Sequence, residues 1–256
     1  IGLGQGDVIN YAIRGALMAI EQMEGFKDFA LYYEVDEHFN TIYDENGKPV
    51  VNLDANGEPE AQFNEAAMIV LGIADSKGDF HYYGLPETQS FNMMFVRKDI
   101  LANLNIEIPK TWDDILEAVT VLQANNMEIG LTTDTNIHLY QMGGTLFADN
   151  GMRINLDSNL ALDSFETMCN MFTQYSFPYK YDFVNRFRTG EMPIGIAGYN
   201  GTYNHLIVFA TELRGLWEFV PMPGYYLTNE KGETYLNNVS VSSVSSIVMI
   251  NGCDDK

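Results

Sequence analysis

Carboxylates are the residues of this sequence whose type and number could support catalysis. Asp113 with Asp114 and Asp254 with Asp255 form adjacent pairs. Neighbouring residues on a helix point in different directions, so neither pair can flank a single bond. For Asp113 and Asp114 we favour an acidic first helical turn that complements the helix dipole. Glu87 and Asp134, placed in separate loops, could still act together as the two carboxylates of a carbohydrate hydrolase, and this hypothesis stays open.

Other catalytic and metal-binding motifs are missing from the sequence. It contains no GxSxG, HExxH or P-loop motif. Gly2, Gly4 and Gly6 resemble half of a dinucleotide-binding fingerprint, but the third glycine has the wrong spacing. The four histidines are dispersed, and Cys169 and Cys253 lack CxxC spacing. The sequence therefore predicts no metal site and no cofactor.

The composition limits the class of protein. The 256 residues are 46% hydrophobic and 12% aromatic, enough for one large domain or two lobes and too much for a disordered chain. No apolar run approaches the roughly 18 residues that cross a bilayer. The net charge of −21 would repel a polyanion, so nucleic acid is not expected as a partner. Because the first residues resemble the end of a strand and the last ones the start of a helix, we expect both termini to lie inside a longer protein.

Three helices are predicted by caps and apolar periodicity. The first runs from Asp7, its N-cap, through Ile20. Thr111 caps the second, and Asp157 or Ser158 opens the third. The third helix is expected to place one apolar face against the core, formed by Leu162, Phe165, Cys169 and Phe172.

Strands alternate with these helices, which predicts an α/β fold. The expected strands are residues 81–86, 91–96, 129–132, 194–198, 217–221 and 246–250. Residues 87–90 are predicted to form a polar loop between the first two strands. Asn-Gly pairs at 46–47 and 56–57 predict a surface hairpin.

Five segments, in order along the chain, carry a resemblance to a known family. They are YGLPETQSFNMMFVRKDIL at 83–101, PKTWDDIL at 109–116, QMGG at 141–144, FRTGEMPIGIAG at 187–198 and FVPMPG at 219–224. With them the chain resembles extracellular solute-binding proteins of family 1, the carbohydrate-type receptors of ABC importers. Val96 stands where the family pattern has tyrosine. The family's early strands, C-terminal helices and secretion signal with an acylated cysteine are not found in the sequence.

The resemblance implies a periplasmic-binding-protein-like (type II) two-lobed α/β fold with hinge strands, truncated at both ends. The first lobe would comprise residues 1–95 plus 243–256 and the second residues 96–242. It also implies an extracellular receptor, not an enzyme, that holds a carbohydrate, expected to be an oligosaccharide, in an interlobe cleft and delivers it to ABC transporter permease subunits. The protein would be a monomer, anchored as a lipoprotein through a segment outside this chain. The alternative is a receptor with the same mechanism whose cargo is a peptide or another polar solute.

Ligands of such folds are bound by loops at the carboxyl ends of strands. Amides and carboxylates there would bind sugar hydroxyls, and tyrosine rings would stack on C–H faces. The candidate ligand-binding residues are Gln5, Asp7, Glu87, Thr88, Gln89, Ser90, Asp134, Asn136, Tyr140, Tyr199, Asn200 and Tyr203. Asp7, Asp134 and Asn136 could equally be helix caps. Trp112 and Trp217 lie on apolar faces and are predicted to be core residues.

Overall fold

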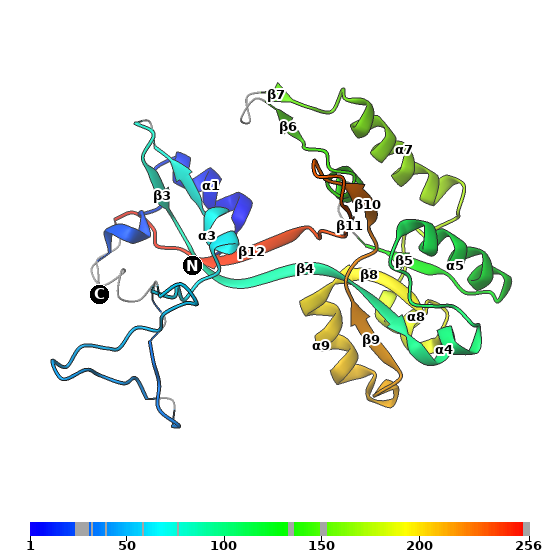
Figure 1. Cartoon of the computed structure of the whole chain (residues 1–256), viewed down its shortest axis with the longest axis horizontal. Helices are drawn as coiled ribbons and strands as arrows, with labels where there is room; N and C mark the ends of the chain where they lie inside the picture. The colour runs from blue at the N-terminus through cyan, green and yellow to red at the C-terminus, as the bar shows by residue number, and fades with distance from the viewer. Residues whose placement is uncertain are drawn as a thin grey trace. The chain divides into compact units, whose positions relative to one another are not determined.

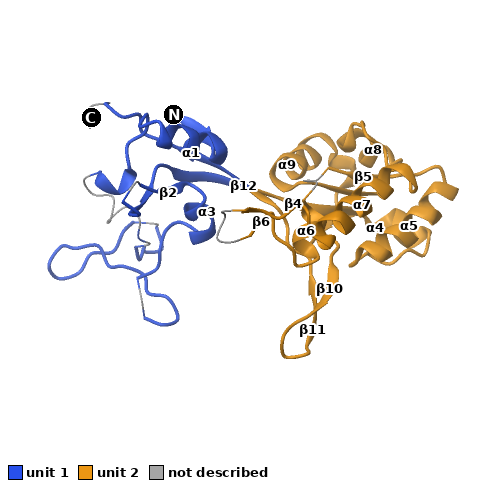
Figure 2. Cartoon of the chain, turned by 90° about the horizontal axis from the view of Figure 1, so that it is seen from above, with its two compact units in different colours: residues 1–89, 243–256 blue, residues 90–242 orange. Residues whose placement is uncertain are grey.

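The chain forms two compact units. The computed structural model describes residues 1–23, 31, 33–38, 40–57, 59–75, 77–132, 136–148 and 153–252. Residues 1–89 with 243–256 make unit 1, and residues 90–242 make unit 2 (Figure 2). Both boundaries fall inside strands, one within β4 (Leu85–Arg97) and one within β12 (Ser242–Ile247).

In unit 1, strand β1 (Gly2–Gly4) pairs antiparallel with β12 and leads directly into helix α1 (Gln5–Ile13). The other elements are η1 (Ile20–Gln22), α3 (Glu65–Ile69), β2 (Gly72–Ala74) and β3 (Phe80–Tyr82). A small core joins α1, α3 and β12 through Val8, Leu17, Ala67, Leu71, Val244 and Val248. Apolar residues thus hold together segments that are more than 200 positions apart in the sequence.

The predicted surface hairpin is confirmed, and its turns share one construction. Asp44 accepts hydrogen bonds at its carboxylate from the backbone N–H groups of Asn46 and Lys48, and Gly47 adopts a φ of +75°. Asp54 likewise accepts a hydrogen bond from the backbone N–H of Asn56, and Gly57 adopts a φ of +83°. The positive φ explains the glycine in each Asn-Gly pair. Backbone amides hold the pKa of the Asp44 carboxyl below its usual range, together with smaller effects of Asn46 and Lys48 side chains.

In unit 2, a sheet is covered by helices on both faces (Figure 1). β8 (Ile194–Gly198) lies between antiparallel β4 and parallel β5 (Ile129–Leu131), and β9 (Trp217–Val220) pairs with β4. Met94 and Val96 of β4 pack with α5 (Trp112–Ala124) and α7 (Asn159–Thr173). Phe95 faces the other way, toward α8 (Phe183–Thr189) and α9 (Tyr199–Phe209). This alternation is what a strand buried on both faces requires.

The remaining elements of unit 2 are short. They are α4 (Lys98–Asn103), α6 (Ile137–Gln141), η3 (Thr211–Leu213), the pair β6 (Phe147–Ala148) with β7 (Arg153–Ile154), and the hairpin of β10 (Tyr225–Thr228) with β11 (Thr234–Asn237). The predicted strands at 129–132, 194–198 and 217–221 are confirmed within a residue or two. Within the described ranges, no helix combines the length and the apolar character needed to cross a membrane.

The predicted loop at residues 87–90 is wrong, because β4 runs unbroken from Leu85 to Arg97. Glu87, Thr88, Gln89 and Ser90 are strand residues. Of these four, Ser90 alone belongs to the residue types that dominate turns, which are glycine, proline, asparagine, aspartate and serine. Polarity alone had suggested a loop, whereas pairing of β4 with its neighbours in the sheet keeps the segment extended.

Three other expectations were wrong in detail. The first helix ends at Ile13, because Gly15 turns the chain with a φ of +67°. Asp7 is not its N-cap; Gly4 holds that position and Asp7 lies in the first turn. The last strand is Ser242–Ile247 rather than 246–250, since its core-facing positions include a buried serine, Ser246, which hid the alternating pattern.

The apolar face predicted for the third helix is wrong at Leu162 and Phe165, whereas Cys169 and Phe172 are half-buried and Phe172 packs against the core. In α7, Leu162 and Phe165 are 57% and 67% exposed. The buried residues are instead Ala161, Ser164, Met168 and Met171. Both stripes have helical spacing, so periodicity alone could not choose between them. The small side chains of Ala161 and Ser164 allow the helix to approach its neighbours closely.

Candidate functional site

One edge of the unit 2 sheet gathers several of the predicted residues. β5 and β8 are parallel and end at this edge, and antiparallel β4 begins its unit 2 portion there. Asn92 of β4 is paired with Gly198, and the backbone N–H of Thr132 donates to Ile196 at 2.8 Å. Carboxyl ends of strands are where open α/β sheets collect ligands. This edge is therefore the candidate site.

Four aromatic rings form a platform at this edge. We define the aromatic platform as Phe91 of β4, Tyr199 and Tyr203 of α9, and Phe219 of β9. Phe91 and Tyr199 are stacked, with ring centroids 5.4 Å apart and planes 5° apart. Tyr199 stacks on Tyr203 at 5.3 Å, and Phe219 meets Tyr199 edge-on at 4.9 Å. Phe91 and Phe219 remain 36% and 38% exposed, so the platform presents aromatic surface to solvent.

The platform rests on a packed core. Phe95, Phe187, Ala197 and Leu206 are buried, and Tyr199 and Tyr203 pack against this cluster. Trp217 lies at its side, half-buried, with its ring 6.0 Å from that of Tyr203. Gly195 of β8 is required beneath it, because a Cβ at this position would clash with the ring of Phe183. The aromatic rings are thus held by well-packed neighbours, which favours a preformed binding surface.

The local sequence explains how Tyr199 reaches this place. β8 reads Ile-Gly-Ile-Ala-Gly and is buried on both faces, as expected for a strand with neighbours on either side. Gly198 is the N-cap of α9, in an extended conformation and without a side-chain cap. Helix α9 therefore starts at Tyr199 itself, and Asn200 falls in its first turn. Tyr203, one turn later, lies on the same face as Tyr199.

Polar groups lie at the same end of the sheet. Ser90 precedes Phe91 on β4, so its side chain points to the sheet face opposite the platform, where its Oγ lies 3.8 Å from where a Cβ on Gly198 would be. Thr132 ends β5 on the neighbouring strand. From the predicted set the structure brings the rings of Tyr199 and Tyr203 into contact, and it places Ser90 and Asn200 at the same end of the sheet. Phe91, Thr132 and Phe219 were not predicted, and the pairing of β4 with β8 and β9 is what places the two phenylalanines there.

The remaining predicted residues are placed elsewhere in the chain. Gln5 of α1 uses its side-chain oxygen to accept a hydrogen bond from the Val244 N–H at 3.0 Å, so it has a structural partner. Asp7, Glu87 and Thr88 are exposed, and Gln89 is half-buried; like Gln5, these four belong to unit 1.

In unit 2, Asn136 holds the N-cap position of α6 without a side-chain capping bond, and Tyr140 of the same helix is half-buried. Asp134 lies outside the described residues. The hypothesis of a Glu87 and Asp134 pair is therefore not tested by the structure.

A buried polar network fixes helix α6. Trp112 is a core residue, as predicted, and its Nε1 donates to Gln141 at 2.6 Å. Gln141 donates in turn to the carbonyl groups of Pro223 and Val239, each at 2.9 Å. His138 Nδ1 lies 2.9 Å from the Tyr225 hydroxyl. Burial lowers the pKa of His138 to about 4, so the imidazole is neutral at physiological pH.

Metal chemistry has no visible support at this site. Across the residues that the structure describes, no group of three or more histidine, cysteine, aspartate or glutamate side chains could hold a metal ion. What the candidate site offers instead is ring faces, hydroxyl groups and amides. These groups suit the recognition of a neutral polar ligand that also has apolar C–H surfaces.

Comparisons with known proteins place the chain in a family. The family model for bacterial extracellular solute-binding proteins matches residues 40–224. A comparison with curated proteins gives no match. One similar solved structure is an ABC transporter solute-binding protein of Thermotoga lettingae bound to α-D-tagatose, with a TM-score of 0.67 and 16% identity, covering 98% of this chain and 57% of that one.

Two further structures show the same fold. The GacH receptor of Streptomyces glaucescens, solved unliganded and with acarbose, has a TM-score of 0.66 and 13% identity, over 99% of this chain and 57% of its own. An ABC substrate-binding protein of Listeria monocytogenes in complex with cycloalternan has a TM-score of 0.63 and 16% identity, over 100% of this chain and 57% of its own. The chain thus spans 57% of the length of each of these structures and has their type II periplasmic-binding-protein-like fold. The chain belongs to the bacterial extracellular solute-binding proteins.

Proposed function

We propose that this protein is an extracellular receptor that binds a carbohydrate, in particular an oligosaccharide, and delivers it to an ABC transporter. The aromatic platform of Phe91, Tyr199, Tyr203 and Phe219 is the observation that carries the proposal. Flat aromatic surface beside hydroxyl and amide groups matches the two chemistries of a sugar, its C–H faces and its hydroxyl groups. The family, and the sugars bound by three proteins of the same fold, support this choice of ligand.

In this proposal no bond is made or broken. The sugar ring lies against the exposed rim of the platform, and the Thr132 hydroxyl and the Asn200 amide exchange hydrogen bonds with its hydroxyl groups. The two units act as lobes, and a ligand stabilises whichever arrangement of them it binds more tightly. The permease then recognises the liganded form. The receptor works as a monomer, and a lipid anchor in a longer form of the protein keeps it outside the cell.

A thermal-shift screen with mono- and oligosaccharides tests the proposal. A sugar at a hundred times its dissociation constant should stabilise the protein by about 2.7 kcal/mol. Tyr199→Ala removes the central ring of the platform and should weaken binding about tenfold. Tyr226→Ala is the matched control, because Tyr226 is exposed on β10 and outside the platform.

Three outcomes would contradict the proposal. The absence of a shift with any glycan would favour peptides or another polar solute as cargo. Equal affinity in the Tyr199→Ala variant would show that the platform is not the site. A shift that decays while reducing ends accumulate would identify a hydrolase, and the loop carboxylates would then have to be reconsidered.

A further inference from the structure

Two segments carry the chain from one unit to the other. The first boundary falls between Gln89 and Ser90, inside β4, and the second falls between Ser242 and Ser243, inside β12. We call residues 85–97 and 240–247 the connecting segments. Neither of them contains a glycine, so a movement of one unit against the other has to bend residues with ordinary backbone preferences.

The strand β4 forms hydrogen bonds along both of its edges. The Arg97 N–H donates to the Pro193 carbonyl at 2.8 Å, next to β8, so the odd-numbered residues of β4 direct their backbone groups toward β8. The even-numbered residues face the opposite edge, where β9 pairs with β4 from Met94 to Arg97. β12 lies on that edge as well, because the sheet order places β4 between β12 and β8.

At Asn92, a side chain takes the place of a partner strand on this edge. The Asn92 N–H donates to the Ser240 Oγ at 2.9 Å, and the same Oγ donates to the Asn92 carbonyl at 2.8 Å. The Val241 carbonyl is a more distant acceptor, at 3.4 Å. In an antiparallel ladder, two residues exchange such a pair of bonds through their backbone groups. A serine hydroxyl is both donor and acceptor, so one side chain supplies both bonds here.

This contact restrains the connecting segments. Asn92 and Ser240 each lie within three residues of a boundary between the units, although they are 148 positions apart in the sequence. Hinge movements are absorbed by φ and ψ changes at a few residues. A rotation at Asn92 would redirect its N–H or its carbonyl group and break a bond to Ser240. The two segments are therefore tied to each other where a hinge would have to bend.

We propose that Ser240 is a positioning residue whose hydroxyl group ties the connecting segments together and thereby restricts the movement of unit 1 against unit 2. Without this hydroxyl group, the segments bend independently and the units adopt a wider range of arrangements. A ligand that stabilises one arrangement has to select it from this range, so the restraint also affects binding. The inference goes beyond the proposed function, because it holds for any solute.

Distances between two spin labels, measured by electron paramagnetic resonance on the ligand-free protein, test the restraint. Ile13→Cys on α1 and Thr120→Cys on α5 place one label at an exposed position of each unit. Cys169 and Cys253 are replaced by alanine in all variants, so that only these two positions react with the label. The width of the distance distribution reports the range of arrangements.

The distance distribution should broaden in Ser240→Ala and keep its width in Ser240→Thr, which retains the hydroxyl group. Hydrogen exchange at the Asn92 amide should be about fivefold faster in Ser240→Ala and unchanged in Ser240→Thr. Ser240→Val has the shape of the threonine variant without its hydroxyl group and should behave like Ser240→Ala. This shape-matched pair also decides the question if circular dichroism shows that Ser240→Ala does not fold.

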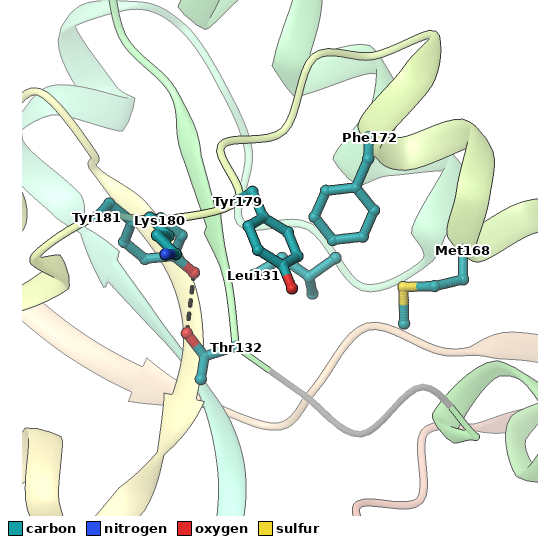
Figure 3. Close-up of a pocket in the computed structure, with 7 residues that line it drawn as sticks. All are labelled: Leu131, Thr132, Met168, Phe172, Tyr179, Lys180 and Tyr181. Atoms are coloured by element: carbon teal, nitrogen blue, oxygen red, sulfur yellow. Dashed lines mark hydrogen bonds between the residues drawn. The ribbon is translucent and has the colours of Figure 1, made fainter.

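Two control variants leave the contact intact. Ser243→Ala makes the same substitution at an exposed position of β12. Tyr181→Phe removes another hydrogen bond between hydroxyl and partner in unit 2, the one that joins Tyr181 to Thr132 with 2.9 Å between the oxygen atoms, outside the connecting segments (Figure 3). Neither control should broaden the distance distribution.

The outcomes separate the restraint from the function. An unchanged width in Ser240→Ala, together with faster exchange at Asn92, would show that the contact exists but does not restrict the units. Equal broadening in Tyr181→Phe would attribute the effect to a general loss of stability. Equal widths in Ser240→Thr and Ser240→Val would mean that the hydroxyl group is not responsible. Each of these results overturns the inference and leaves the receptor function standing, since the thermal-shift screen alone decides that function.

Discussion

At the scale of single residues, His138 makes stability depend on pH. Its pKa is lowered by burial from 6.5 to about 4, so between these values the unfolded chain binds a proton that the folded chain does not. The stability that the protein gains by keeping His138 neutral is fully present above pH 6.5 and is lost as the pH falls toward 4. In this window we expect His138 to lower the free energy of unfolding by up to about 1.4 kcal/mol for each pH unit of acidification. Urea unfolding of His138→Phe should show a flatter pH dependence there. His205→Gln, which alters an exposed histidine, should not differ from the natural protein; identical slopes for all three proteins would contradict the assignment.

Part of the candidate site can be predicted from the types and spacing of its residues. Tyr199, Asn200 and Tyr203 could be predicted because two glycines flank a strand-to-helix turn, a local signal. Phe91 could not, since in the sequence it begins an apolar run and is indistinguishable from a core residue. Its position in the platform depends on the register of β4 against β8, which pairs residues about 100 positions apart. Local patterns carry no information about such pairings.

At the scale of elements, the start of α5 is set by a reciprocal cap. The Thr111 hydroxyl accepts from the Asp114 N–H at 3.1 Å, and the Asp114 carboxylate accepts from the Thr111 N–H at 2.8 Å. Thr111→Ala should therefore lower the free energy of unfolding by about 1 kcal/mol in urea titrations. Thr120→Ala, the same change at an exposed position inside α5, should be neutral or slightly stabilising. An equal effect of both substitutions would mean that the cap contributes nothing beyond helix propensity.

Elements were predictable where a specific local interaction defines them. The cap of α5 is an example, as are the Asn-Gly turns, whose glycines need a positive φ. Where only polarity or periodicity was available, the predictions failed for physical reasons. The polar residues of β4 are extended because neighbouring strands hold them, and α7 buries the stripe with small side chains rather than the one with Leu162 and Phe165. Tertiary packing decides such cases.

At the scale of the molecule, the family resemblance supplied what local patterns lacked. The α/β class followed from alternating elements, but the pairing of β1 with β12 joins the two ends of the chain and has no local signal. The motifs at 83–101 and 187–198 indicated the family, which the match over residues 40–224 confirms. Motifs of this kind contain the long-range pairings implicitly, because they belong to strands that meet in the folded protein.

The distribution of core residues predicts that residues 90–242 fold on their own. Both apolar clusters of unit 2 lie entirely within this continuous segment, whereas the cluster of unit 1 needs residues from both ends of the chain. A protein of residues 90–242 should therefore unfold in one cooperative transition, followed by circular dichroism during heating. Phe187→Ala in that protein removes a ring that is completely buried and should cost about 3–5 kcal/mol, enough to lower the transition markedly or abolish it. Phe209→Ala, at a ring that is mostly exposed, should leave the transition nearly unchanged. A non-cooperative melt of residues 90–242 would show that the stability of unit 2 depends on unit 1.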